Sequence, residues 1–245
     1  MATHATNVAL EREARPAHGA EPAHGAHHEE SWFKKYLWST DHKIIGMQYL
    51  FTGMAMALLG GFFAYAFRMQ LAFPGISVPG YGVVSPGEYN ALVTSHGSIM
   101  VFWVAMPVLI AAFGNYLIPL MIGCDDMVFP RLNRLSYQIF LVSALVMIAS
   151  FFVPGGAFGG AWTAYPPLSS TAEYSLTPIG SSMWLVAVAL EFVAFLLGGI
   201  NFIVTVMNSR APGMRLMDIP MVIWMIIIAS IVFMASVGPL IAGAV

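Results

Sequence analysis

Residues 219–245 read IPMVIWMIIIASIVFMASVGPLIAGAV, a run without a single charged side chain. A membrane-crossing helix needs about 20 mostly apolar residues, so residues 219–243 of this run are long enough to span a bilayer. Three further runs also lack charges: 44–67, about 94–122 and 135–153. Another, at about 182–208, is interrupted only by Glu191. The sequence therefore predicts an all-α membrane protein with five transmembrane helices.

The overall composition supports this fold class and excludes several others. Only 9% of the 245 residues are charged and 58% are hydrophobic, whereas a soluble domain carries about 25% charged residues. This shortage of charge excludes an ordinary soluble enzyme, a disordered protein and a nucleic-acid-binding protein with a basic face. We expect a lipid bilayer, and no nucleic acid, as a partner. The single cysteine, Cys124, excludes a disulfide framework and a cysteine-based metal site.

The N-terminal segment differs from the rest of the chain. Residues 1–37 contain the near-repeat PAHGAE/PAHGAH and a cluster of histidines, whereas residues 38–245 form the predicted transmembrane domain. Having few apolar residues, the arm cannot bury a core of its own, so its composition favours a solvated, disordered segment. A metal-binding tail is the alternative interpretation of its histidines.

Basic residues alternate between the predicted loops and so indicate an orientation. Most lie before the first span, between the second and third, or between the fourth and fifth: Lys34, Lys35, Lys43, Arg131, Arg134, Arg210 and Arg215. Only Arg68 falls in the other loops, 68–93 and 154–181, which we therefore expect to face outward. The N-terminus is then expected to be cytosolic, and Trp184 suits the outer interface. We expect the membrane to be the cytoplasmic (inner) membrane of a prokaryote. The end of the chain within the fifth span suggests a split or truncated polypeptide completed by other helices.

His96 is the histidine that falls within an apolar span. It lies in the sequence Thr94-Ser95-His96-Gly97-Ser98, near the predicted outer end of the second helix. Ionisable groups inside a membrane are costly and often functional, and a neutral imidazole is a common axial ligand of haem iron. The alternative is a histidine that only forms a hydrogen bond to a neighbouring helix.

A second set of polar residues is predicted at the opposite membrane face. Asn115 follows His96 by about 28 Å along an ideal α-helix, close to one bilayer thickness. Other polar residues expected at this depth come from two further helices and a loop: Gln48, Tyr49, Asp126, Asn133 and Asn201. Such a cluster is typical of a water-filled entrance for protons or ions. Ordinary interfacial polarity with amide hydrogen bonds between helices is the alternative.

Glu191 is the one carboxylate within the predicted spans. It precedes Asn201 by ten residues, or roughly 15 Å along a helix. An unpaired buried carboxylate tends to be protonated, so Glu191 is a candidate proton carrier. A neutral, hydrogen-bonded structural role is equally compatible with the sequence.

From Trp38 onward the sequence resembles the N-terminal part of subunit I of the haem–copper terminal oxidases, the cytochrome c oxidase family. Six motifs carry the resemblance: STDHK at 39–43, SHGSIMVFW at 95–103, GNYLIPLMIG at 114–123 followed by FPRLNR at 129–134, WTAYPPLS at 162–169, GINF at 199–202 and NSRAPGM at 208–214. The resemblance implies that the five spans belong to a larger bundle of about twelve helices.

The resemblance also implies roles for individual residues. His96 matches the axial ligand of a low-spin haem, expected to be haem A, and Arg68 matches the basic residue beside the haem edge. Trp162 and Tyr165 match residues near the haem propionates. Asp126 matches the mouth of the family's proton-uptake route. The remaining matches to that route are its polar lining and a neighbour: Asn115, Asn133, Asn201 and Tyr49.

Some positions depart from the family pattern. Phe195 stands where the proton route often has a serine, which would narrow a water path, and the resemblance transfers no role to Glu191. The ligands of the high-spin haem and of copper, and the second low-spin ligand, come from later helices in the family. The active site is therefore expected to be completed by residues outside 1–245.

The resemblance implies a respiratory enzyme. We expect part of the catalytic subunit of a proton-pumping oxidase that reduces dioxygen to water with electrons from cytochrome c. Its expected partners are the remaining helices of subunit I, a subunit II carrying the site where electrons arrive, and a subunit III. A quinol oxidase of the same superfamily and a haem-free proton-conducting or transporter subunit are the alternatives.

Overall fold

A computed structural model describes residues 31–171 and 178–244 of the chain. Among these residues, five helical segments are long and apolar enough to cross a membrane: His42–Ala72, Pro86–Ile122, Pro130–Phe152, Ile179–Asn208 and Met221–Leu240. The predicted all-α membrane fold with five spans is thereby confirmed. The histidines of the N-terminal arm lie outside the described residues.

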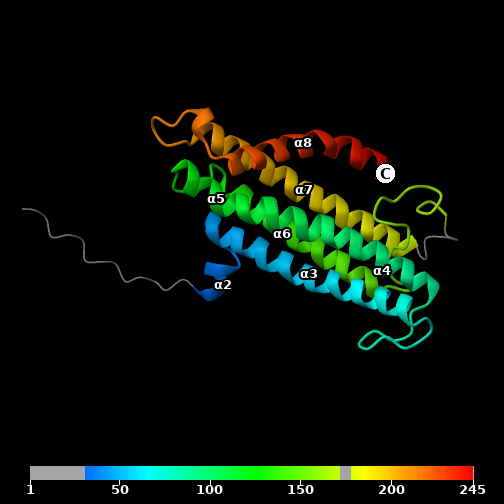
Figure 1. The fold of residues 1–245 in the computed structure, drawn as a ribbon. Helices are drawn as coiled ribbons and strands as arrows, with labels where there is room; N and C mark the ends of the chain where they lie inside the picture. The colour runs from blue at the N-terminus through cyan, green and yellow to red at the C-terminus, as the bar shows by residue number, and fades with distance from the viewer. Residues whose placement is uncertain (1–30, 172–177, 245) are drawn as a thin grey trace, which may run out of the picture.

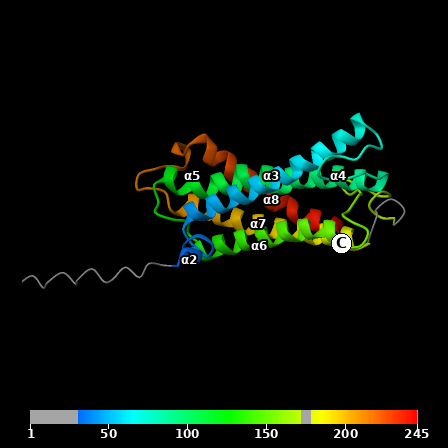
Figure 2. The same ribbon diagram turned by 90° about the horizontal axis from the view of Figure 1, so that it is seen from below.

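The spans run side by side, up and down along one direction (Figures 1 and 2). Their elements in chain order are α2 (Trp32–Tyr36), α3 (His42–Ala72), α4 (Pro86–Ser98), η1 (Ile99–Ala105), η2 (Pro107–Ala112), α5 (Phe113–Ile122), α6 (Pro130–Ala149), η3 (Ser150–Phe152), α7 (Pro178–Asn208), η4 (Leu216–Asp218) and α8 (Met221–Ala244). The start of α3 and the end of α5 share one end of the bundle, here called the Asp126 end. The end of α3 and the start of α4 share the other, the His96 end.

Local sequence explains where the first two spans begin and where the second ends. The side chain of Asp41 accepts hydrogen bonds from the first N–H groups of α3, and Ser85 forms a reciprocal capping box with Glu88 at the start of α4. The second span ends at Gly123, whose φ of 75° is a left-handed conformation that glycine adopts without strain.

Three residues lie elsewhere than the sequence indicates. Trp32 starts the short helix α2, although its segment was assigned to the disordered arm. Arg68 lies on the last turns of α3 rather than in the following loop, because the helix continues to Ala72. Trp184, expected at the outer interface, turns into the bundle: it is buried, and its indole N–H donates to the hydroxyl of Ser98 over 2.9 Å.

The second span is not a regular α-helix. Its middle consists of the π-helical segments η1 and η2, in which N–H groups bond five residues back, as Met106 does to Val101. Pro107, the first residue of η2, has no N–H to donate, which disrupts the α-helical pattern. A π-helix has more residues per turn, so the distance from His96 to Asn115 is shorter than the α-helical estimate. Such segments are frequent at functional sites.

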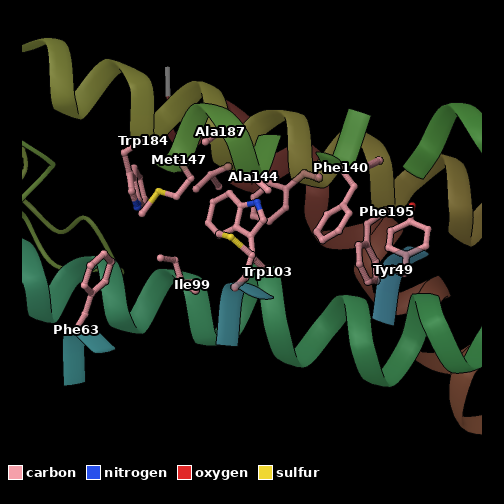
Figure 3. Packing of buried hydrophobic residues seen from close by; sticks show 14 of the residues in the cluster. Tyr49, Phe63, Ile99, Trp103, Phe140, Ala144, Met147, Trp184, Ala187 and Phe195 are labelled. Carbon is pink, nitrogen blue, oxygen red and sulfur yellow. The ribbon is translucent and has the colours of Figure 1, made fainter. Parts of the chain in front are cut away.

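Two consecutive side-chain hydrogen bonds cross the apolar core. Trp103 is fully buried between the helices, and its indole N–H donates to Ser143 Oγ over 3.0 Å. Ser143 in turn donates to the carbonyl of Ala187 over 2.8 Å, so α6 is hydrogen-bonded to both neighbours. Figure 3 shows Trp103 among the buried apolar side chains around these bonds. An unsatisfied buried donor costs about 1–3 kcal/mol, which explains why a serine stands among the large apolar side chains here.

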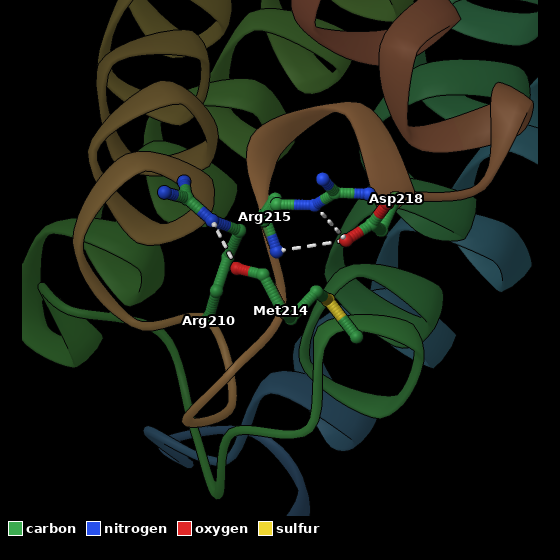
Figure 4. A network of polar contacts seen from close by, with 4 residues as sticks. All are labelled: Arg210, Met214, Arg215 and Asp218. Atoms are coloured by element: carbon green, nitrogen blue, oxygen red, sulfur yellow. Dashed lines mark hydrogen bonds and ion pairs between the residues drawn. The ribbon is translucent and has the colours of Figure 1, made fainter.

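Polar contacts between its own residues hold the loop between α7 and α8 together (Figure 4). The guanidinium of Arg215 forms a two-pronged ion pair with Asp218, and Arg210 donates to the carbonyl of Met214. The charge of Arg215 holds the pKa of Asp218 below its usual value. The loop thus keeps two basic residues at the Asp126 end.

Gly114 on α5 packs tightly against the ring of Phe202 on α7. A methyl group at this position would lie 2.9 Å from two ring atoms of Phe202, which is itself buried. We expect Gly114→Ala to destabilise the fold by about 1–3 kcal/mol, the usual cost of overpacking. Thermal unfolding of the solubilised protein measures the effect. Gly61→Ala is the matched control, because nothing lies within 4 Å of a methyl group there; equal stability of the two variants would contradict this account of the helix contact.

Candidate functional site

The imidazole of His96 is oriented by a backbone group of the neighbouring helix. Its Nδ1 atom lies 2.9 Å from the carbonyl oxygen of Gly60 on α3. A carbonyl only accepts hydrogen bonds, so Nδ1 carries the proton and Nε2 keeps a free lone pair. Phe67 packs edge-on against the ring, with 5.5 Å between the centroids. The side chain is only partly buried, so one side of the imidazole remains open.

A strained loop covers the residue next to this histidine. Trp162 lies so close to Gly97 that a methyl group there would be 3.0 Å from the indole. Ala161 and Ala164 in the same loop have positive φ angles of 63° and 51°, which cost energy in residues other than glycine. The N–H of Ala161 bonds to Thr94 Oγ1 over 2.9 Å, which holds the loop on α4.

The other two predicted residues of this end are less enclosed. Arg68 is exposed near the end of α3, directly after the Phe67 that contacts His96. Tyr165 lies in the Trp162 loop and is 73% exposed. The described part of the chain therefore brings Trp162 beside the His96 segment, but it does not enclose Arg68 or Tyr165.

The donor set at this end suits one axial position of a haem. Within residues 31–171 and 178–244, no group of three or more His, Cys, Asp and Glu could hold a metal ion by itself. A haem needs only one imidazole from this chain at one axial position, and His96 presents Nε2 with its other nitrogen already bonded to a carbonyl. The residues present therefore fit the group.

At the opposite end, Asp126 lies against the start of α3. Burial raises the pKa of its half-buried carboxyl above the ordinary value. Two neighbours lower the pKa because they favour the charged form: the N–H of Met127, and His42 through its imidazole and its N–H. This balance suits a carboxyl that exchanges protons with water.

His42 joins Asp126 to the second span. It is 3% exposed, and its Nδ1 donates to the carbonyl of Asn115 over 2.8 Å. The amide nitrogen of Asn115 donates to Ala111, which leaves its buried Oδ1 without a partner among the described residues. No role of His42 was predicted from the sequence; its position directly after the helix cap Asp41 is the signal that could have indicated one.

The other predicted polar residues form a second group at the same end. Asn201 on α7 accepts from the N–H of Phe129 over 3.0 Å. Tyr49 on α3 donates to Ser136 Oγ over 3.0 Å, and Ser136 donates to the carbonyl of Asn133 over 2.7 Å. The amide of Asn133 is fully buried, and neither of its polar atoms has a partner among the described residues.

Buried polar atoms without protein partners commonly bond to ordered water. Four such atoms lie towards the Asp126 end: Gln48 Oε1, Asn115 Oδ1 and both polar atoms of the Asn133 amide. They belong to three different spans. The arrangement can therefore hold water inside the bundle next to a surface carboxyl.

Five helices long and apolar enough to cross a bilayer define an integral membrane protein. Residues 44–245 match the family described as cytochrome c and quinol oxidase polypeptide I, and the chain belongs to this family.

Several curated relatives are similar over most of this chain. An alternative cytochrome c oxidase subunit 1 from Bradyrhizobium diazoefficiens is 37% identical over 224 residues, which cover 91% of this chain and 37% of the relative. A cytochrome c oxidase subunit 1 from Thermostichus vulcanus is 40% identical over 86% of the chain and 36% of its own length. A heme-copper oxidase subunit I+III from Aeropyrum pernix is 41% identical over 87% of this chain and 25% of its own length. The chain thus spans little more than a third, or less, of these proteins.

Proposed function

We propose that this chain is the N-terminal portion of the catalytic subunit of a respiratory terminal oxidase. The complete enzyme would reduce dioxygen to water with electrons from cytochrome c and move protons across the membrane. Membership of the family and the names of the relatives support this proposal. The single observation that carries it is His96, whose Nε2 is left free by the bond between Nδ1 and Gly60.

In this proposal His96 holds the iron of a low-spin haem, expected to be haem A, through Nε2. The Gly60 carbonyl fixes the tautomer and the ring orientation, and Trp162 closes the loop over the neighbouring Gly97. Haem and copper supply the electron-transfer and oxygen chemistry when bound. Arg68 and Tyr165 are proposed to contact the haem edge and the propionates once the remaining helices are present.

Asp126 is proposed to admit protons at the other end. The half-buried carboxyl takes a proton from water and is held in place by His42 and the N–H of Met127. Beyond it, the unpartnered amide atoms of Asn115 and Asn133 bind water, and Asn201 and Tyr49 line the same end of the bundle. The chain's residues thus provide an uptake site and a polar interior.

The distribution of basic residues supports a cytosolic Asp126 end. Residues that flank this end include Lys43, Arg134, Arg210 and Arg215, whereas Arg68 lies near the His96 end. Since cytosolic loops carry the excess of Lys and Arg, the proposed orientation places the N-terminus in the cytosol. The proposed membrane is the cytoplasmic membrane of a prokaryote. Protons would be taken up from the cytosol, and haem would lie near the outer face.

The proposed partners complete the enzyme. Later helices of subunit I supply the second low-spin ligand, the high-spin haem ligand and the copper ligands, and a subunit II receives the electrons. A subunit III is supported by the name of the Aeropyrum relative, which joins subunits I and III.

The purified assembly tests this function. We expect haem bands in its optical spectrum, copper by metal analysis, and oxygen consumption with reduced cytochrome c. The family description also includes quinol oxidases, so the second candidate is oxygen consumption with a quinol and none with cytochrome c. A preparation with neither haem nor copper would reject both oxidases and support a haem-free proton-conducting subunit.

A further inference from the structure

Two hydrogen bonds set the antiparallel register of α6 and α7. Ser143 bonds to the carbonyl of Ala187, and the N–H of Phe129 bonds to the side chain of Asn201. Phe129 and Ser143 are as far apart in sequence as Ala187 and Asn201. The register of the two helices is therefore the same at both hydrogen bonds. Glu191, one turn from Ala187 towards Asn201, therefore lies beside the middle of α6.

Glu191 is enclosed by this chain alone. Its side chain is 0% exposed, and neither carboxyl oxygen has a hydrogen-bond partner among the described residues. Because its oxygens are already covered, helices beyond residue 245 would have to displace this packing to reach them. An unpaired charge in such surroundings is very costly, so the neutral acid is the favoured form at rest.

A chain of buried hydroxyl groups leads from the Asp126 end towards this carboxyl. Ser136 donates to the carbonyl of Asn133, and Tyr49 donates to Ser136, with all three residues at most 2% exposed. The ring of Tyr49 packs against Phe140 of α6, with 5.0 Å between the ring centroids, at the level where the register places Glu191. Tyr137 is the other titratable residue at this depth of the bundle. Three further segments that pack against α7 contain no titratable residue: η1, η3 and α8.

Phe195 separates Glu191 from Asn201 along α7. It lies one turn from Glu191 towards Asn201, is buried, and packs against Phe233 with 5.2 Å between the ring centroids. An apolar ring at this position excludes water on that face of α7. The polar route to Glu191 therefore runs on the side of α3 and α6, past Tyr49 and Ser136.

From this arrangement we propose that Glu191 is an internal proton-carrying group, supplied from the Asp126 end through the Tyr49–Ser136 hydroxyls and water bound to Asn133. Its O–H bond breaks as the proton passes to a water molecule on the side of the His96 end, which forms a new O–H bond and becomes hydronium while Glu191 is left as a carboxylate. A proton from the hydroxyl and water chain then restores the acid. This inference rests on the proposed proton-translocating function and adds a residue to it.

The test uses the complete oxidase assembly with Glu191→Gln, which keeps the size of the side chain but cannot release a proton in the same way. We expect proton uptake during turnover to fall roughly tenfold or more, as for loss of a positioned acid. Infrared difference spectra between oxidised and reduced enzyme should contain a carboxylic-acid C=O band that shifts in heavy water and is absent from the variant. Glu191→Asp should restore part of both signals.

Glu88→Gln is the matched control. Glu88 is an exposed carboxylate at the His96 end, and glutamine can keep its capping bond to Ser85. We expect normal uptake and an unchanged infrared band. Thermal unfolding and the haem spectrum of Glu191→Gln should match the parent, which separates proton transfer from a structural role.

Two results would overturn the inference. One is unchanged proton uptake with the same infrared band in Glu191→Gln; the other is slow uptake accompanied by loss of the haem spectrum and of thermal stability. If Asp126→Asn slows uptake in the same assembly while Glu191→Gln does not, only this inference fails and the proposed function stands. Absence of haem from the parent assembly would instead reject the function itself.

Discussion

Replacement of His96 by Ala is expected to remove the low-spin haem bands from the optical spectrum of the assembled oxidase. The imidazole is the proposed protein ligand on this side of the iron, and its Nδ1 is already occupied by the Gly60 carbonyl. Loss of a hydrogen-bond partner of a ligand typically costs about 10- to 100-fold in affinity or activity, and loss of the ligand itself should cost more. Reduced-minus-oxidised spectra and haem content measure the result.

Two further measurements make this result specific. Added imidazole should restore part of the low-spin spectrum in His96→Ala, because it can occupy the space left by the side chain. His42→Gln also removes a buried histidine, but at the opposite end of the bundle, and should keep the bands. An unaltered low-spin spectrum in His96→Ala would rule this residue out as the ligand.

The second large effect is expected at the other end of the bundle. Asp126→Asn removes the carboxyl that is proposed to take protons from water, and we expect proton uptake to slow by roughly 100-fold, within the usual range for loss of a positioned acid–base group. Time-resolved proton uptake with a pH-sensitive dye in the assembled enzyme measures this. The haem spectrum should stay unchanged, because His96 lies towards the opposite end of the second span.

The pKa of Asp126 adds a pH dependence to this prediction. Burial raises the pKa, so the carboxyl becomes fully charged only at a higher pH than an exposed aspartate does. Uptake in the parent should therefore change with pH above the ordinary aspartate range, and the asparagine variant should lose that step. Asp125→Asn, an exposed neighbour, is the control and should behave as the parent does. Full uptake and pumping in Asp126→Asn would show that protons are admitted elsewhere.

The membrane fold could be predicted from the sequence because a bilayer imposes a simple rule. Charged side chains are excluded from its hydrocarbon core, so the charge-free runs give the five spans, and backbone hydrogen bonding requires them to be helical. The same rule made His96 and Glu191 conspicuous, since each interrupts an apolar run. The roles assigned to them remain proposals, whereas the five-span fold is confirmed.

The partners of these residues could not be predicted in the same way. His96 bonds to Gly60 across 36 positions of the sequence, and His42 bonds to Asn115 across 73. Apolar runs without a marked polar face do not reveal how each helix is rotated, so the sequence could not indicate that Trp184 turns inward. The π-helical segments around Pro107 likewise change the rotation between the two ends of the second span.

Residue types along the chain are enough to predict five crossings and to separate an imidazole and an aspartate towards opposite ends, because the cost of placing a side chain in lipid depends strongly on its chemical type. Contacts between the helices establish which nitrogen of His96 is free, which amides are left without partners among the described residues, and that Glu191 is fully buried inside the bundle. These properties depend on contacts between helices distant in sequence, where close packing fixes the position and partner of each polar atom.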